Sequence, residues 1–140
     1  MIRFTIEGTP RPQGSKRHVG NGIMLESSKY VKGWRAFAKL KATQMCSPKL
    51  RIEKPNAVLV TAVFYFDRPK KHFRANGILR DDAPAFHVTR PDAEKLMRAL
   101  LDAITGVCFH DDSQVAKQVI EKRYGFARTE VCVSDLFEGT

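Results

Sequence analysis

The sequence predicts an α+β fold, in which a small mixed β-sheet of four or five strands carries helices packed mainly on one face. Apolar and polar residues alternate over residues 2–7, and an almost continuous apolar run covers 57–66. Two longer segments, 28–45 and 92–105, have the apolar spacing of helices. The 140 residues, 43% of them hydrophobic, suffice for one core and are too few for two. We therefore expect a single domain over residues 1–140.

The first elements follow in order from the N-terminus. Ile2, Phe4 and Ile6 alternate with polar residues, which predicts a strand over 2–7 that is buried on one face. Prolines and glycines between residues 9 and 22 then predict an exposed basic loop. The helix over 28–45 comes next, and Trp34 falls within its apolar face.

The second half of the chain begins with a strand over 57–66 that we expect to be central and buried on both faces. A helix over 92–105 should end at Gly106, which is a frequent C-terminal cap. The remaining expected segments are a basic loop over 68–74, a short β segment over 107–109, and strands over 114–123 and 128–134 joined near Gly125.

The net charge of +9 is unevenly distributed. Residues 1–55 carry twelve Lys or Arg and three acidic residues, whereas residues 56–140 carry twelve of each. A basic surface is typical of proteins that bind a polyanion such as nucleic acid. Seven of the fifteen acidic residues lie between residues 81 and 112, and such a cluster on a basic protein suggests a cation site.

The sequence also excludes some classes of protein. No stretch approaches the roughly 20 apolar residues that span a bilayer, so we expect no membrane partner. The N-terminus lacks the layout of a signal peptide. Cys46, Cys108 and Cys132 have no metal-binding spacing and cannot all pair with one another, so we expect thiols in a reducing cytoplasm.

Asp92 and Glu94 are the first candidates for chemistry, because they stand at the start of the second helix directly after Pro91. Residues two apart do not share a helix face. If Asp92 still belongs to the extended segment before the helix, both carboxylates can converge on one point. The alternative is that Asp92 complements the helix dipole and Glu94 pairs with Arg98 at i+4.

Asp111 and Asp112 follow a short apolar segment, and adjacent aspartates repel each other unless a cation lies near. Mg²⁺ prefers oxygen ligands, usually one or two carboxylates with waters and substrate phosphates. Spacing alone leaves the choice between a metal site and a solvated acidic surface open. His110, beside them, is either a general base or a partly buried neutral histidine.

These motifs together resemble a known family. The stretch from Arg90 to Gly106 (RPDAEKLMRALLDAITG), followed by Asp111-Asp112-Ser113-Gln114-Val115, is similar to the signature of RusA-type Holliday-junction resolvases. The two linked motifs cover about a quarter of the chain, and the order of the other expected elements is compatible. Glu94 stands where the family usually has Asp, and Arg98 stands where characterised relatives have a catalytic lysine.

The resemblance implies an Mg²⁺-dependent endodeoxyribonuclease, with Mn²⁺ as an alternative ion, that resolves four-way DNA junctions in recombination and repair. It implies a homodimer that nicks two opposed strands symmetrically, in the cytoplasm of a bacterium or of a phage-infected cell. Asp92, Glu94 and Asp112 would be catalytic and would bind the metal ion. Asp111 would be a further ligand, and Arg98 would stabilise charge on the phosphate.

Basic side chains in three parts of the chain are the candidates for DNA contact. The alternative for each of them is an ordinary solvated surface. Two other functions also stay open, namely a non-catalytic module that binds branched DNA and a broader structure-specific nuclease that acts on flaps and forks. The candidate DNA-binding residues are Arg11, Lys16, Arg17, Lys32, Arg35, Lys39, Arg68, Lys70, Lys71, Arg74 and Arg90.

Overall fold

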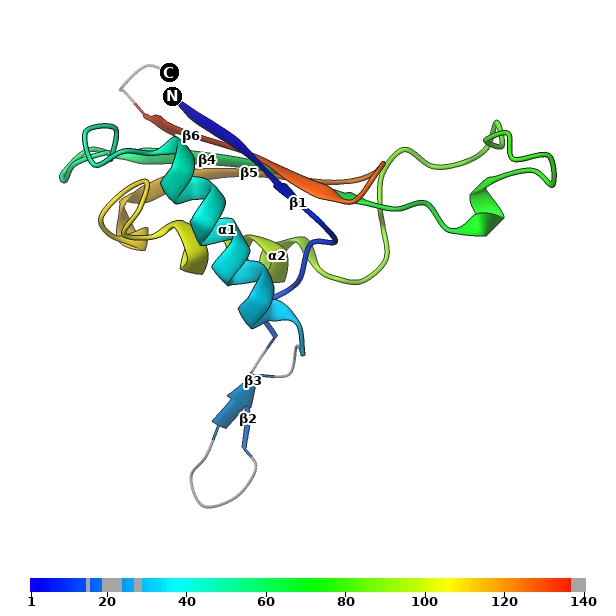
Figure 1. Cartoon of the computed structure of the whole chain (residues 1–140), viewed down its shortest axis with the longest axis horizontal. Coiled ribbons are helices and arrows are strands. Elements are labelled where there is room, and N and C mark those ends of the chain that lie inside the picture. The colour runs from blue at the N-terminus through cyan, green and yellow to red at the C-terminus, as the bar shows by residue number, and fades with distance from the viewer. Residues whose placement is uncertain (15, 19–23, 27–28, 137–140) are drawn as a thin grey trace.

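The computed structural model describes residues 1–14, 16–18, 24–26 and 29–136. Its centre is a mixed four-stranded sheet with strand order β1-β6-β4-β5 (Figure 1). The strands are β1 (Ile2–Glu7), β4 (Val58–Phe66), β5 (Val115–Tyr124) and β6 (Arg128–Asp135). β6 pairs antiparallel with both β1 and β4, whereas β4 and β5 are parallel. The predicted α+β class and the predicted mixed sheet are confirmed.

Two helices, α1 (Val31–Met45) and α2 (Ala93–Ile104), lie on the same side of this sheet (Figure 1). Every second side chain of β4, from Val58 to Phe66, is buried toward the helices, and the side chains between them are half-buried. The expectation that β4 is buried on both faces is therefore wrong for its outer face, because none of the described helices covers that face. β4 is nevertheless a central strand, since it lies between β6 and β5.

The segment after β1 differs from the loop that the sequence predicted. Lys16–His18 (β2) and Met24–Glu26 (β3) form an antiparallel hairpin, with Lys16 opposite Glu26. Strands of three residues are too short to show an alternating pattern, so the prolines and glycines around them dominated the prediction.

The segment after α2 is also corrected. Residues 107 and 108 belong to a turn over 106–108, and 107–109 form no β strand, because the end of α2 uses their backbone groups. Gly106 has φ of +87° and donates its N–H to the carbonyl of Phe109 at 2.8 Å, and Cys108 donates to the carbonyl of Ile104 at 3.1 Å. The predicted capping role of Gly106 is confirmed, since a positive φ favours glycine. Phe109 keeps only isolated bridges, to Ile52 and Thr105.

Two short 3₁₀ helices, η1 (Lys70–His72) and η2 (Asp112–Gln114), complete the described elements. Residues 67–91, here called the arm, leave the end of β4 and project away from the sheet before they return to α2 (Figure 1). Among the described residues, no helix has the length and the apolar character needed to cross a membrane.

Candidate active site

The first group of candidate residues lies at the N-terminus of α2. Asp92 is the N-cap residue and has an extended backbone, with φ of −69° and ψ of 142°, as the position of Pro91 predicted. Its side chain makes no capping hydrogen bond and lies 4.0 Å from the ammonium group of Lys95. Glu94, in the first turn, accepts a hydrogen bond from Arg98, four residues further along the helix. The pairing of Glu94 with Arg98, one of the two alternatives from the sequence, is therefore present.

Lys122, on β5, holds the segment that leads into Asp92. Its ammonium group donates to the backbone carbonyls of Thr89 at 2.7 Å and of Pro91 at 2.8 Å. Burial lowers the pKa of Lys122, and the nearby carboxylate of Asp92 opposes that shift. The sequence pattern did not identify this residue, because its partners lie about thirty positions away and are backbone atoms.

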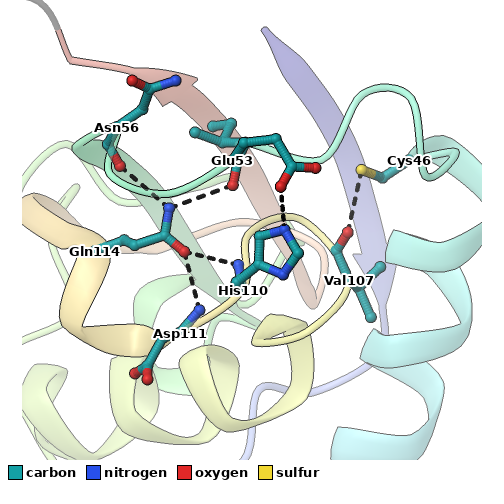
Figure 2. Close-up of polar contacts among 8 residues, drawn as sticks. Cys46, Glu53, Asn56, Val107, His110, Asp111 and Gln114 are labelled. Carbon is teal, nitrogen blue, oxygen red and sulfur yellow. Dashed lines mark hydrogen bonds and ion pairs between the residues drawn. The ribbon is translucent and has the colours of Figure 1, made fainter.

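The second group lies beyond the other end of α2. Asp111 caps η2, and its carboxylate accepts the N–H of Ser113 at 3.0 Å. Gln114 is buried and connects two loops (Figure 2). Its side-chain oxygen accepts the backbone N–H groups of His110 at 2.8 Å and of Asp111 at 3.0 Å. Its amide nitrogen donates to the carbonyls of Ile52 at 3.3 Å and of Asn56 at 3.1 Å.

Negative charge accumulates in this second group. A hydrogen bond with Asp111 raises the pKa of Asp112, and partial desolvation and the nearby charges of Asp111 and Asp102 raise it further. The N–H of Ser113 lowers the pKa of Asp111, as does the neighbouring Asp112, and Lys54 lies 3.8 Å from its carboxylate. Two neighbouring carboxylates disfavour the ionised form of Asp112, and a bound cation would offset their repulsion. Asp112 therefore has the electrostatic surroundings of a cation ligand.

The two groups are separated by the length of α2. Asp112 is close enough to Asp102 to feel its charge, whereas Asp92 lies ten residues before Asp102, or about 15 Å along the helix axis. Within the described parts of the chain, no three His, Cys, Asp or Glu side chains are grouped so that they could hold one metal ion. Asp92, Glu94 and Asp112 therefore do not form one cluster in the described part of the chain, and their assignment as metal ligands stays a prediction. Each pair of carboxylates still fits the one or two that Mg²⁺ usually takes from a protein.

Glu53 adds a carboxylate to the second group that sequence reasoning missed. It comes from the loop between α1 and β4 and is hydrogen-bonded to Nε2 of His110 (Figure 2). A carboxylate at one ring nitrogen neither supplies nor excludes a general base at the other, so this role of His110 stays a prediction.

The basic residues of the N-terminal part are placed as follows. Lys32 and Lys39 are exposed on α1, while Arg35 between them donates to the side-chain oxygen of Gln13. The guanidinium group of Arg11 lies 4.6 Å from the ring centroid of Tyr30. The side chains of Lys16 and Arg17 fall outside the described part of the chain.

The basic residues of the arm fall into two kinds. Lys70, Lys71 and Arg90 are exposed, and Arg74 is exposed with an ion pair to Asp81 at 3.3 Å. Arg68, in contrast, donates to the carbonyl of Pro84 at 2.8 Å and lies 5.3 Å from the ring centroid of Tyr124. Arg68 thus stabilises the base of the arm, and DNA contact by the others stays a prediction.

The fold and these two carboxylate groups define a small α+β protein with a basic surface and paired acidic side chains at both ends of one helix. Residues 5–134 match the family described as "Endodeoxyribonuclease RusA", and the chain belongs to this family. The chain is also 28% identical over 148 residues to "Uncharacterized protein YqaN" of Bacillus subtilis (strain 168), with 96% of each chain covered. Members of the RusA family are endodeoxyribonucleases that act on branched DNA junctions.

Proposed function

We propose that this protein is an Mg²⁺-dependent endodeoxyribonuclease that resolves Holliday junctions by paired symmetric nicks, in DNA recombination and repair. The family match supports the nuclease chemistry. The observation that carries the assignment of the site is the Asp111–Asp112 pair, which Gln114 holds in place and whose excess negative charge favours a cation.

The residues of the chain would contribute in distinct ways. Asp92 and Asp112, both exposed, would be metal ligands, and Glu94 and Asp111 would be the second ligand of each pair. When bound, Mg²⁺ polarises a phosphate and lowers the pKa of an attacking water. Arg98 carries a planar fork of donors that suits a phosphate oxygen, and its present partner Glu94 keeps it beside the helix N-terminus.

The separation of the two carboxylate groups affects which copies of the expected homodimer would supply the ligands of one metal ion. Asp102, whose charge Asp112 feels, lies about 15 Å along the helix axis from Asp92, which argues against a single ion bound by Asp92 and Asp112 of the same chain. Either each pair holds its own ion, or one ion is shared by Asp92 of one copy and Asp112 of a second copy. The second arrangement would make dimerisation a condition for cleavage, and it fits an enzyme that nicks two strands together.

The decisive experiment is a cleavage assay on a synthetic four-way junction, with and without Mg²⁺. We expect symmetric nicks only with the ion. Asp92→Asn and Asp112→Asn should each abolish nicking while junction binding persists. Glu130→Gln, which alters an exposed carboxylate on β6, is the matched control and should cleave normally. If junction binding is retained but no nicks appear under any metal, the protein is not a resolvase.

One observation favours a second function, a non-catalytic module that binds branched DNA. Glu94 and Arg98, the two residues that depart from the family pattern, pair with each other. The guanidinium group of Arg98 thus neutralises the carboxylate of Glu94, which is a candidate metal ligand. The double variant Glu94→Asp with Arg98→Lys separates the two functions. If the wild-type protein only binds junctions and this variant cleaves them, the departures have silenced the site.

A further inference from the structure

The arm is fixed to the sheet at its base. Where it returns, Tyr124 donates its N–H to the carbonyl of Ala85 at 3.1 Å, and His87 donates to the carbonyl of Lys122 at 2.9 Å. The buried ring of His87 stacks on Phe66, the last residue of β4, with 4.1 Å between centroids. The arm is therefore anchored to both parallel strands.

The far end of the arm is an ordered turn over residues 73–79. Phe73 and Leu79 form an antiparallel bridge, and Arg74 donates its N–H to the carbonyl of Ile78 at 2.7 Å. Gly77 has φ of +85°, which closes the turn, and the side chain of Asn76 accepts the N–H of Ile78 at 3.1 Å. These contacts give the tip a defined shape without help from the core.

The tip exposes apolar side chains in a basic setting. Phe73 is 36% exposed, Leu79 is 41% exposed and Ile78 is 60% exposed, all within one short turn. Grouped apolar exposure of this kind marks a binding surface more often than scattered single residues do. The arm carries six basic and three acidic residues, so the surface suits a partner that is both anionic and able to take apolar contacts.

We propose that residues 73–79 form a wedge that contacts the exposed base faces at the branch point of a DNA junction, while Lys70 and Lys71 bind the flanking phosphates. This inference rests on the proposed function. In a continuous duplex the base faces are covered by their neighbours, whereas a branch point offers faces to an apolar side chain. The wedge would therefore give selectivity for branched over linear DNA.

The first test compares the affinities of variants for a four-way junction and for a linear duplex of the same sequence, without Mg²⁺. Phe73→Ala with Ile78→Ser should bind the junction about tenfold more weakly and the duplex unchanged, as expected when base stacking is lost. Ile78→Ser alone changes only the most exposed apolar side chain of the tip, so it still tests the wedge if the double variant fails to fold. Leu40→Ser, at an exposed leucine of α1, is the matched control and should bind both DNAs normally.

The second test separates apolar contact from charge. Lys70→Gln with Lys71→Gln should weaken binding to both DNAs and should reduce the slope of log affinity against log salt by about two. The wedge variants should leave that slope unchanged. A junction labelled with 2-aminopurine at the branch point should brighten with saturating wild-type protein, because the base unstacks, and should not brighten with the wedge variants.

The outcomes are distinguishable. If the wild-type protein has no preference for junctions, the proposed function fails. If the preference exists and both wedge variants retain it together with the fluorescence change, the wedge is wrong. If the wedge variants instead alter the oligomeric state in light scattering, the tip covers a second copy of the chain, and the DNA assignment is overturned.

Discussion

The side-chain oxygen of Gln114 accepts the backbone N–H of Asp111 at 3.0 Å, while its amide nitrogen reaches the carbonyl of Asn56 at 3.1 Å. One buried side chain thus fixes the loop of the Asp111–Asp112 pair against the loop before β4.

Gln114→Ala should lower the free energy of unfolding by about 2–3 kcal/mol, because it leaves several backbone groups without partners. Gln118→Ala, at an exposed glutamine of β5, the strand that follows Gln114, should cost less than about 0.5 kcal/mol in the same urea titration. Equal effects of the two changes would contradict the role of Gln114.

Lys122 should affect cleavage more than binding, because it holds the backbone on which Asp92 begins. Lys122→Met should reduce the rate of junction cleavage at saturating DNA by about tenfold to a hundredfold. Lys122→Arg should restore part of that rate. Lys117→Met, at an exposed position of β5, is the control. If Lys122→Met weakens junction binding as much as cleavage, its effect is not on Asp92.

Mixing two inactive variants tests whether one metal site is shared between two copies. Heterodimers of Asp92→Asn with Asp112→Asn would contain one site with both aspartates intact if the ion is shared between copies. If each pair holds its own ion and cleavage needs both pairs of one chain, neither chain of the heterodimer is complete. We expect the mixture, after joint unfolding and refolding, to nick one strand of the junction while each variant alone stays inactive. A mixture as inactive as its parts would favour separate sites within each chain.

His87 should make the fold less stable at mildly acidic pH. Burial lowers the pKa of His87, and the charge of Lys122 lowers it further. The unfolded chain, with a histidine pKa near 6.5, then binds a proton that the folded chain does not. The free energy of unfolding should therefore fall as the pH is lowered below about 6.5. His87→Phe, which keeps a ring against Phe66, should show a smaller fall between pH 7.5 and 5.5, and an unchanged fall would contradict this account.

The cysteines should differ in reactivity. Cys46 and Cys108 are buried, and burial above all raises the pKa of Cys108 to about 12. Cys132 is half-buried on the outer face of the sheet. Ellman's reagent should thus react rapidly with one thiol in the folded protein and with all three in urea. If Cys132→Ser leaves the rapid reaction in place, the assignment is wrong.

Local patterns in the sequence predicted much of the fold. The alternation in residues 2–7 and the helical spacing in 92–105 appear as β1 and α2 at nearly the expected bounds, because each element buries one face. The same patterns could not reveal how far apart Asp92 and Asp112 lie. That separation depends on the direction in which α2 runs across the sheet, and no local pattern records it.

The positions of Gln114 and Lys122 show the same limit. Each side chain bonds to backbone atoms of segments distant along the chain, and those segments meet only when the sheet is complete. The segment 107–109 was mistaken for a strand for a related reason. Cys108 and Phe109 are buried, and burial without alternation does not identify a strand.

The parallel pairing of β4 and β5 has a consequence for how such a protein can change over time. Parallel neighbours cannot be joined by a tight hairpin, so the chain must cross the sheet between them. The arm, α2 and both carboxylate pairs all lie in that single crossing, whereas β1 and β6 contribute none of them. Residues can thus be gained or lost in the arm without altering the register of any strand. Substrate preference can diversify in this connection while the sheet is inherited unchanged.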